Sequence, residues 1–474
     1  MRLITMPLSP DHPSNVSPSP PTEELTATPN GPSTATSIQN GRSLDPESAP
    51  FGLKAYRKLS KAAAPIANFT LERRLNAGKE DPDRIDERRG VASVERPDGS
   101  LIWIHGASVG ESLSVIPLVE RLSQKRPDIR FLVTTGTVTS AALMKERLPA
   151  GAIHQFIPLD HPAFVRRFLD HWRPTGALFV ESEFWPNLLL AARESVAFMA
   201  LVNGRVSPRS FQSWSQRPHT IRYLLSAFDI IIAQDGQNRE RLESLSGAAG
   251  ATYGNLKNAA PPLPAEADDV AAAKAMLGQR PVWLAASTHE GEEELIIDAH
   301  RRLTAEFPDL LTIIAPRHPT RGEETMDLVR AASRTGQRRS QKAGFDPSTE
   351  IYIADTLGEL GLFYRLSSVA FVGGSLIKKG GHNPLEPARL GCAILHGPHI
   401  FNFVETYADM RQGGGAALVR NERDLATSVR RLLKDEKTRA AMARAAQSAA
   451  EASAEKTLAH VADDILRRLP ASVS

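Results

Sequence analysis

Short apolar runs alternate with longer segments of helical periodicity from about residue 100 to the end of the chain. Such alternation is typical of parallel sheets built from strand, helix, strand units. The apolar runs predict a first series of strands at residues 101–105, 130–134, 177–181, 198–203 and 229–233. A second series is predicted at residues 282–286, 311–315, 351–354, 369–372 and 393–396. The pattern therefore predicts an α/β protein with two doubly wound, Rossmann-like domains.

Three prolines, Pro261, Pro262 and Pro264, lie between the two series of predicted strands. Proline disfavours regular structure and suits a linker, and a chain of 474 residues is too long for one compact core. The predicted parts are an N-terminal domain, a linker and a C-terminal domain with terminal helices, over residues 91–257, 258–266 and 267–474. We expect the two domains to face a cleft, because ligands of such sheets bind at the carboxyl ends of the strands.

The first 50 residues are dense in Pro, Ser, Thr and Asn and have almost no aliphatic runs. Such a segment buries too little apolar surface to offset its ordering entropy, so residues 1–50 are predicted to form a disordered leader. No apolar stretch approaches the roughly 20 residues that a membrane-spanning helix needs, and the N-terminus lacks the apolar core of a signal peptide. These features predict a cytoplasmic protein.

A basic amphipathic helix region is predicted over residues 51–90. The apolar positions at helical spacing are Leu53, Tyr56, Leu59, Ala63 and Ile66, and the lysines on another face are Lys54, Lys58 and Lys61. The region holds ten Lys and Arg against six Asp and Glu, a surplus larger than the net charge of +3 of the whole chain. Two interpretations stay open: a helix on an anionic bilayer, or a helix packed on the protein's own core with a solvated basic face.

Overall composition excludes several classes of protein. The single cysteine, Cys392, excludes an internal disulfide and fits a reducing compartment. The small net charge argues against wholesale binding of nucleic acid. His289 and His318 match no zinc spacing, so we predict hydrogen-bonded or solvated histidines and no metal site.

A glycine-rich run follows the predicted strand at residues 369–372. It comprises Gly373-Gly374-Ser375 and Gly380-Gly381-His382-Asn383-Pro384-Leu385-Glu386, and its end reads as the start of a helix. Glycines let a ligand approach the backbone, free amides at a helix N-terminus favour phosphate, and the carboxylate of Glu386 could hold sugar hydroxyls. The run indicates a nucleotide-sugar pocket, with an ordinary glycine-rich turn as the alternative.

Carboxylates follow two strands of the first series. The segment ending at Glu111 superficially resembles a dinucleotide fingerprint, but its glycines lie four apart and no acidic residue ends the second strand, so nicotinamide binding is disfavoured. Glu111 is a candidate general base, or simply a first-turn Glu favoured by the helix dipole. Glu181 and Glu183 would be costly to bury unpaired, which favours a site role over a surface loop.

The second series carries a candidate phosphate ligand. Arg317 lies between two prolines that stiffen its loop, and its forked donors suit a phosphate. The nearby acidic run at residues 290–294 is interpreted as the first turn of a helix with a solvated face.

Taken in order, these motifs resemble those of the 3-deoxy-D-manno-octulosonic acid (Kdo) transferases, the glycosyltransferases of lipid A. The matching segments are HGASVGE (105–111), ESEFWPN (181–187), GNLK (254–257), STHEGE (287–292), PRHP (316–319) and FVGGS through GHNPLE (371–386). The resemblance runs from about residue 52 to the C-terminus. It implies a GT-B fold and an inverting transfer of Kdo from CMP-Kdo to a lipid A precursor at the inner face of the inner membrane.

The resemblance also implies roles for single residues. Glu111 would be the general base, and Glu181 and Lys257 would support the transition state. The N-terminal domain would bind the acceptor and the C-terminal domain would bind CMP-Kdo. The residues implied to contact CMP are Arg317, His318, Leu357, Gly358, Glu359, Asn383, Pro384, Leu385 and Glu386. No cofactor and no metal is implied, since departing phosphate charge can be neutralised by Arg317 and Lys257.

The chain departs from the family at its N-terminus. Family members commonly begin with a strongly apolar anchor, whereas here a polar leader precedes a basic and moderately apolar helix. Weaker membrane attachment, attachment through lipid electrostatics, or an incorrectly placed start codon would each account for this difference. The alternative functions are another GT-B enzyme that uses a UDP-sugar, a related epimerase, or a non-catalytic lipid-binding protein of this fold.

Overall fold

The computed structural model describes residues 44–341 and 344–469. Residues 1–43 of the predicted leader lie outside the described residues. Residues 44–50, which the prediction included in the leader, are structured: they contain a 3-10 helix, η1 (Pro46–Ser48), and Leu44 packs against the apolar core. The folded part of the chain therefore begins at or before Leu44, earlier than the sequence predicts.

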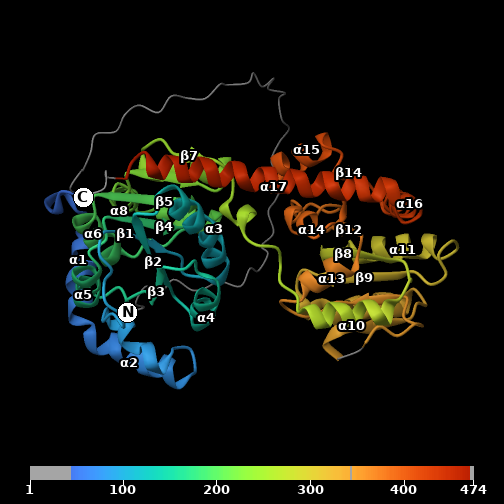
Figure 1. Cartoon of the computed structure of the whole chain (residues 1–474), viewed down its shortest axis with the longest axis horizontal. Coiled ribbons are helices and arrows are strands. Elements are labelled where there is room, and N and C mark those ends of the chain that lie inside the picture. Colours follow the sequence, from blue (N-terminus) through green and yellow to red (C-terminus); the bar gives the residue numbers. More distant parts are fainter. Residues whose placement is uncertain (1–43, 342–343, 470–474) are drawn as a thin grey trace. The chain divides into compact units, whose positions relative to one another are not determined.

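Within the described residues, the first sheet has seven parallel strands in the order β3-β2-β1-β4-β5-β6-β7 (Figure 1). The strands are β1 (Ser100–His105), β2 (Ile129–Thr135), β3 (Ala152–Phe156), β4 (Gly176–Val180), β5 (Phe198–Gly204), β6 (Ile230–Ala233) and β7 (Ala251–Thr252). The helices that follow them are α3 (Val109–Lys125), α4 (Val138–Arg147), α5 (Pro162–Trp172), α6 (Pro186–Ser195), α7 (Pro208–Ser215), α8 (Pro218–Leu225) and α9 (Gly236–Ser246). The order reverses between β1 and β4, so ligands are expected at the loops after these two strands.

The second sheet, taken over the same described residues, has seven parallel strands in the order β10-β11-β9-β8-β12-β13-β14. They are β8 (Val282–Thr288), β9 (Leu311–Pro316), β10 (Gly336–Arg338), β11 (Ile351–Ile353), β12 (Val369–Val372), β13 (Ala393–His396) and β14 (Ala416–Leu418). Its helices are α10 (Ala267–Leu277), α11 (Glu293–Leu303), α12 (Gly322–Ala331), α13 (Leu360–Leu366), α14 (Leu385–Arg389), α15 (Val404–Gln412) and α16 (Glu422–Lys434). Here the order reverses between β8 and β12.

Both sheets are buried on both faces, which explains their nearly continuous apolar strands. Along β1, Leu101 and Trp103 belong to one core cluster, while Ile102 and Ile104 belong to another on the opposite face. The two predicted doubly wound sheets are thus confirmed, and every expected strand is present to within about two residues.

The long C-terminal helix α17 (Glu436–Leu466) contacts elements that belong to both sheets. It packs against α14 and β13, and its last turns contact α3. Val461, Ala462 and Ile465 join the core cluster that includes Ile102. Residues near the C-terminus, which the sequence assigns to the second domain, therefore contribute to the core of the first.

Two helices form the N-terminal region: α1 (Phe51–Ala62) and α2 (Ala64–Asn76). The predicted helix region is interrupted at Ala63, because Pro65 has no N–H to donate and its ring disfavours a continuous helix, so a second helix begins at Ala64. The apolar residues do not share one face: Leu53 is buried against Leu190, whereas Leu59 and Ile66 are more than half exposed.

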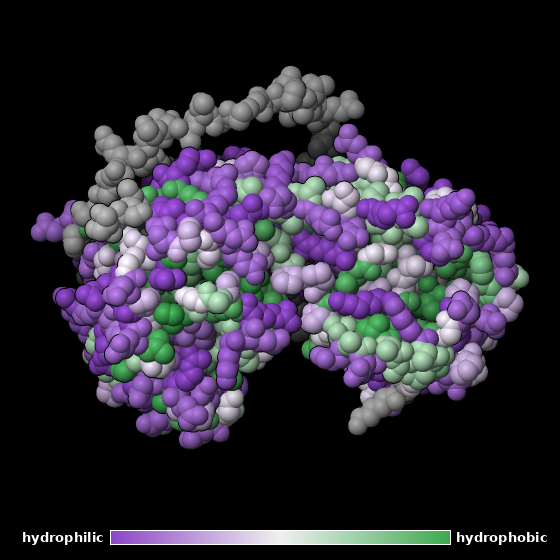
Figure 2. Space-filling model, in the orientation of Figure 1, coloured by the Kyte–Doolittle hydropathy of each residue, from purple (hydrophilic) through white to green (hydrophobic). Residues whose placement is uncertain are grey.

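The described helices include none that is both long enough and apolar enough to span a bilayer. On the face drawn in Figure 2, hydrophilic side chains predominate and apolar side chains lie scattered between them.

Candidate functional site

The loop from β1 to α3 holds Glu111 in the first turn of the helix. Ser108 caps the helix and donates its hydroxyl to Glu111 Oε1 at 2.6 Å, and the Ala107 amide donates to Glu111 Oε2 at 2.8 Å. The carboxylate is buried. Burial raises the pKa of Glu111 above its usual value, and the charge of Glu181 adds to this effect, while the hydrogen bonds from Ser108 and Ala107 and the charge of Lys257 oppose it.

Glu181 follows β4, on the other side of the point where the strand order reverses. Its backbone is left-handed, with φ of 63°, which costs a non-glycine residue about 1–2 kcal/mol. Such strain persists where the surrounding structure enforces it, and it collects at functional sites. The Lys257 Nζ atom lies 2.5 Å from Glu181 Oε1.

Glu183 and Trp185 complete the loop after β4. The Trp185 indole donates to Glu183. Burial raises the pKa of Glu183 to about 7, and the charges of Glu111 and Glu181 raise it further, against the Trp185 hydrogen bond. Three carboxylates and one lysine therefore gather at the carboxyl edge of the first sheet.

Lys257 reaches this group from the 3-10 helix η3 (Leu256–Ala259). The Asn203 side chain at the end of β5 accepts a hydrogen bond from the Leu256 amide at 2.9 Å, which holds η3 in place. A Cβ atom added to Gly110 would lie 3.8 Å from Lys257 Nζ, so the lysine lies beside the first turn of α3. The predicted trio of Glu111, Glu181 and Lys257 is thus brought together by three separate connections of the first sheet.

Asn203 lies beside the candidate site, and the sequence analysis did not identify it. It is buried, its φ is 55°, and its Nδ2 atom has no hydrogen-bond partner within the part of the chain that the structure describes. A left-handed Asn at the carboxyl end of a buried strand is the signal that could have identified it.

The second sheet places Arg317 and His318 directly after β9, and both side chains are exposed. The His289 and His382 rings stack at 5.1 Å, with their Nε2 atoms 2.8 Å apart, and the His318 ring lies 6.1 Å from His289. Burial lowers the pKa of His289 and of His382 to about 4, helped by the charge of Arg317. His289 is hydrogen-bonded to His382, whereas the His318 side chain is exposed, so each of the two predicted states is found at one of the two residues.

The segment from Asn383 to Glu386 opens the short helix α14. Asn383 Oδ1 accepts the Leu385 amide at 3.1 Å, and the Pro384 and Leu385 side chains are buried. Burial raises the pKa of Glu386, while Asn383 and the charge of Arg317 oppose the rise. Arg317 and Glu386 are therefore close enough to interact.

The loop after β11 is adjacent to the loop that carries Arg317, because β11 pairs with β9 in parallel. Leu357 is 82% exposed and Gly358 has a positive φ of 83°. The Glu359 carboxylate accepts hydrogen bonds from Arg339 Nε at 3.1 Å, and these bonds lower the pKa of Glu359. The Glu359 carboxylate therefore already forms an ion pair with Arg339.

The acidic run at residues 290–294 differs in part from its prediction as a solvated face. Glu292 and Glu293 are fully buried. Glu292 accepts four backbone amides, from His289 at 3.2 Å and from Gly374, Ser375 and Leu376 at 2.6, 3.0 and 2.9 Å. The prediction is confirmed for the first turn of α11, which holds Glu293 and Glu294, and for the exposed Glu290 and Glu294. It is wrong for Glu292, because three of the four amides that satisfy this carboxylate lie more than 80 residues away in sequence.

Within residues 44–341 and 344–469, no group of three or more His, Cys, Asp or Glu side chains is placed to hold a metal ion.

Comparisons with known proteins identify the family. The family model of the 3-deoxy-D-manno-octulosonic-acid transferases (kdotransferases) matches residues 83–260. The chain is 36% identical over 371 residues to a probable mitochondrial 3-deoxy-D-manno-octulosonic acid transferase of Arabidopsis thaliana, covering 76% of this chain and 83% of the relative. It is 35% identical over 366 residues to the 3-deoxy-D-manno-octulosonic acid transferase of Haemophilus influenzae, covering 75% and 84%.

Among solved structures, a glycosyltransferase from Rickettsia africae ESF-5 matches with a TM-score of 0.55 at 12% identity, over 78% of this chain and 100% of that chain. This likeness shows the fold, which is the predicted GT-B arrangement of two Rossmann-like domains. The sequence similarity extends over most of both chains for the relatives named above. The chain therefore belongs to the 3-deoxy-D-manno-octulosonic acid transferase family, glycosyltransferases that transfer Kdo.

Proposed function

We propose that this protein moves Kdo from CMP-Kdo to a lipid A precursor, lipid IVA, in lipopolysaccharide core biosynthesis, with inversion at the anomeric carbon and without a metal ion. Membership of the family supports the transfer of Kdo. The donor, the acceptor and the stereochemistry are the proposed parts. The cluster of Glu111, Glu181 and Lys257 is the single observation that carries the mechanism.

In the proposed reaction, Glu111 removes the proton from an acceptor hydroxyl. The hydroxyl oxygen forms a bond to the anomeric carbon of Kdo, and the bond from that carbon to the phosphate oxygen breaks, so CMP leaves with the bonding pair. A raised pKa suits the base, because proton transfer is most efficient when the pKa of the base lies near the working pH. Attack opposite the leaving group accounts for inversion.

Lys257 and Glu181 would support charge development in this step. The ion pair at 2.5 Å fixes the ammonium beside the first turn of α3, where Glu111 also lies. A fixed cation close to the reacting oxygens lowers the energy of the transition state without reorganising as the reaction proceeds. The left-handed backbone of Glu181 fits this role, because strained residues collect at functional sites and Glu181 lies at the carboxyl edge of the sheet.

The donor would bind at the second sheet. Exposed Arg317 offers a forked cation to the phosphate of CMP, with His318 beside it. Glu386 and the polar side chain of Asn383 would contact the nucleotide or sugar hydroxyls, and the backbone of Pro384 and Leu385 would border the same site. The loop of Leu357, Gly358 and Glu359 would border the same site, with Leu357 available for an apolar contact with the base.

The helices α1 and α2 are proposed to rest on the anionic cytoplasmic face of the inner membrane. Phe51, Leu59, Ile66 and Phe69 are each more than half exposed, and the exposed lysines of α1 are Lys54, Lys58 and Lys61. Large apolar side chains with lysines beside them bind anionic interfaces. Leu53 and Leu71 point the other way and are buried, so the helices are held by the protein while their outer side stays free.

Mass spectrometry of the lipid product tests the proposal. Purified protein incubated with CMP-Kdo and lipid IVA should give the acceptor with added Kdo, whereas UDP-sugars in place of CMP-Kdo should give none. A sugar transferred from a UDP donor would support the alternative GT-B enzyme, and binding of lipid IVA without any product would support the non-catalytic alternative. Nuclear magnetic resonance of the new glycosidic bond reports inversion or retention.

Vesicle flotation tests the membrane surface. The protein should float with vesicles that contain anionic phospholipid and less so with zwitterionic vesicles, and added salt should release it. The double variant Leu59→Ser, Phe69→Ser removes exposed apolar area and should weaken flotation, while Val91→Ser, at an exposed residue outside α1 and α2, serves as its control. Equal flotation of the two variants would contradict the assignment.

A further inference from the structure

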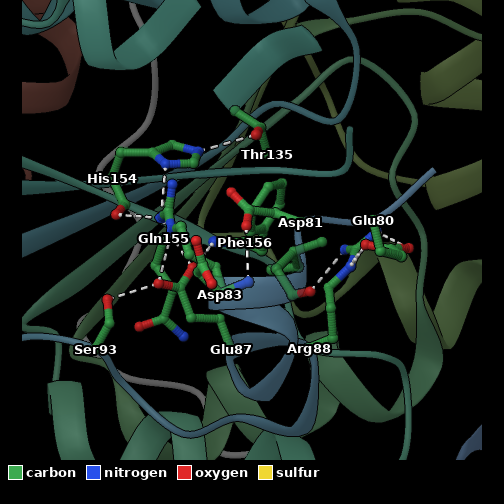
Figure 3. A network of polar contacts seen from close by, with 12 residues as sticks. Glu80, Asp81, Asp83, Glu87, Arg88, Ser93, Thr135, His154, Gln155 and Phe156 are labelled. Atoms are coloured by element: carbon green, nitrogen blue, oxygen red, sulfur yellow. Dashed lines mark hydrogen bonds and ion pairs between the residues drawn. The ribbon is translucent and has the colours of Figure 1, made fainter. Parts of the chain in front are cut away.

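A buried arginine joins the N-terminal region to the edge of the first sheet. Arg88 lies in the 3-10 helix η2 (Pro82–Arg89), and its side chain and that of Glu80 point toward one another (Figure 3). The Nε and Nη2 atoms of Arg88 lie 3.0 and 3.2 Å from the two Glu80 oxygens. Both residues are about 5% exposed, so the charge pair is shielded from water. A buried pair of this kind adds little net stability over an apolar pair, whereas removing one partner is strongly destabilising.

The remaining donors of Arg88 reach two backbone carbonyls. Nη1 donates to the Ile157 carbonyl at 2.9 Å, and Nη2 donates to the Gly136 carbonyl at 2.7 Å. Ile157 follows β3 and Gly136 follows β2, so both carbonyls lie at the carboxyl edge of the sheet, the edge that carries Glu111. Arg88 thus fixes the loops next to the candidate base.

Gly136 is in direct contact with the Glu111 loop. The Gly136 amide donates to the Ala107 carbonyl at 3.1 Å, and a Cβ atom added to Gly136 would lie 3.2 Å from that same oxygen. The Ala107 amide in turn donates to Glu111 Oε2 at 2.8 Å. Three hydrogen bonds, joined by the backbone of Gly136 and of Ala107, therefore lead from the Arg88 guanidinium to the Glu111 carboxylate.

We propose that Arg88 is a positioning residue, which holds the Ala107 amide against Glu111 and so fixes the orientation of the carboxylate for proton transfer. The inference rests on the proposed role of Glu111 as the base. Glu80 completes the arrangement, because it orients Arg88 and also binds Arg74 of α2 at 2.6 Å. The helix α2, which also carries the exposed residue Phe69, is therefore linked to Arg88 through Glu80.

Arg84 provides a matched control on the same 3-10 helix. It pairs with buried Glu87 at 2.9 Å and donates to the His154 carbonyl at 3.0 Å, so it also combines an ion pair with a backbone contact at the sheet. Its side-chain hydrogen bonds go to Glu87 and His154 and do not reach Gly136 or Ala107 within the part of the chain that the structure describes. Substitution of Arg84 therefore tests loss of a similar network without the link to Glu111.

The experiment compares Arg88→Lys with Arg84→Lys in full-length protein, using CMP-Kdo and lipid IVA and rates per folded molecule. Lysine keeps the charge but cannot serve the three acceptors in the same fork. Arg88→Lys should lower kcat by about 10-fold to 100-fold, as expected for a small misplacement of a reacting group, with the KM for CMP-Kdo nearly unchanged. Arg84→Lys should leave kcat close to that of the parent protein.

The pH profile separates positioning from a merely structural role. The charged groups that face Glu111 are Glu181, Glu183 and Lys257, and none of them is altered in this comparison. A weaker bond from Ala107 raises the pKa of Glu111, so the acid limb of kcat/KM should move to higher pH in Arg88→Lys. Loss of folded protein alone scales all rates equally and leaves the limb in place.

Gly136→Ala tests the same link from its other end without touching the ion pair, and it covers the case in which Arg88→Lys does not fold. The added methyl group pushes on the Ala107 carbonyl, so the acid limb should move in the same direction. An unmoved limb in both variants overturns the inference, while an inactive Glu111→Gln variant still supports the proposed base. Normal turnover of Glu111→Gln would instead remove the proposed function, and the inference with it.

Discussion

The two sheets each place a buried glutamate in the first connection from strand to helix, and the two glutamates differ in how many of their acceptor positions are taken. A carboxylate accepts about four hydrogen bonds. Glu111 receives one backbone amide and one hydroxyl, and a lysine and two further carboxylates lie near it. Glu292 receives four backbone amides and is fully buried.

This difference distinguishes the Glu111 carboxylate, which can act as a base, from the Glu292 carboxylate, which stabilises the fold. Glu111 retains acceptor capacity for a substrate hydroxyl, which a general base requires. Glu292 has none left, and its bonds instead hold the glycine loop at Gly374, Ser375 and Leu376 in the form that faces the candidate donor site. Burial raises the pKa of both carboxyl groups, so the pKa shift alone does not distinguish them.

The sharpest test of the comparison is Glu111→Gln. Glutamine keeps the shape of the side chain but cannot accept a proton at the working pH, so kcat should fall by about 10²-fold to 10⁴-fold. Thermal unfolding should be nearly unchanged, because few hydrogen bonds are lost. Steady-state kinetics with CMP-Kdo and lipid IVA, beside a melting curve, measure both quantities. A variant that melts early and turns over normally when folded would reverse the two roles.

Glu292→Gln should have the opposite signature. The side-chain NH₂ group of glutamine is a donor, so it would face backbone N–H groups that now have no acceptor. We expect this loss to lower the unfolding free energy by at least about 2 kcal/mol. Equilibrium urea denaturation measures this loss. Glu290→Gln is the matched control in the same segment, since its side chain is 86% exposed and should tolerate the change. Equal stability of the two variants would show that the four amide contacts do not hold the loop.

Arg317→Ala sharpens the comparison at the second sheet. A charged hydrogen bond to phosphate contributes about 1.5–3 kcal/mol, so the affinity for CMP should fall by roughly 10-fold to 100-fold. Isothermal titration with CMP measures it without the acceptor. Arg330→Ala removes an arginine that is 58% exposed on the following helix and should leave the affinity unchanged. Undiminished CMP binding by Arg317→Ala would remove Arg317 from the donor site.

The smallest expected effect is the shift of the pH profile in Glu181→Gln, and it has a definite sign. The charge of Glu181 raises the pKa of Glu111, so its removal lowers that pKa. Lys257, released from its ion pair, acts in the same direction. The base then stays deprotonated to lower pH, and the acid limb of kcat/KM should move down by about one pH unit or less. A shift to higher pH would contradict the charge arrangement around Glu111.

The sequence predicted the regular parts of this fold because the central strands of both sheets are buried on both faces and form continuous apolar runs. The strands that it missed are β3, β7, β10 and β14. β7 and β10 are only two and three residues long, and β10 consists of Gly336, Gln337 and Arg338, so no apolar run marks it. Edge strands of this kind form through pairing with a neighbour rather than through burial of their own side chains.

The candidate site was predicted where a motif follows a strand directly, as with Glu111, Glu181 and Arg317. It was not predictable where the partner lies far along the chain. Asn203 holds η3 across 53 residues, and Glu292 is satisfied by amides 82 to 84 residues away. Such contacts depend on which strands are neighbours in the sheet, which local patterns do not specify.

The pH dependence of turnover in Glu111→Gln tests the central claim most directly. The parent protein should lose kcat/KM as the pH falls through the raised pKa of Glu111, because the protonated acid cannot accept a second proton. The residual activity of Glu111→Gln, measured over the same range with the same substrates, should lack this acid limb. An acid limb of the same shape and midpoint in both proteins would show that another group accepts the proton.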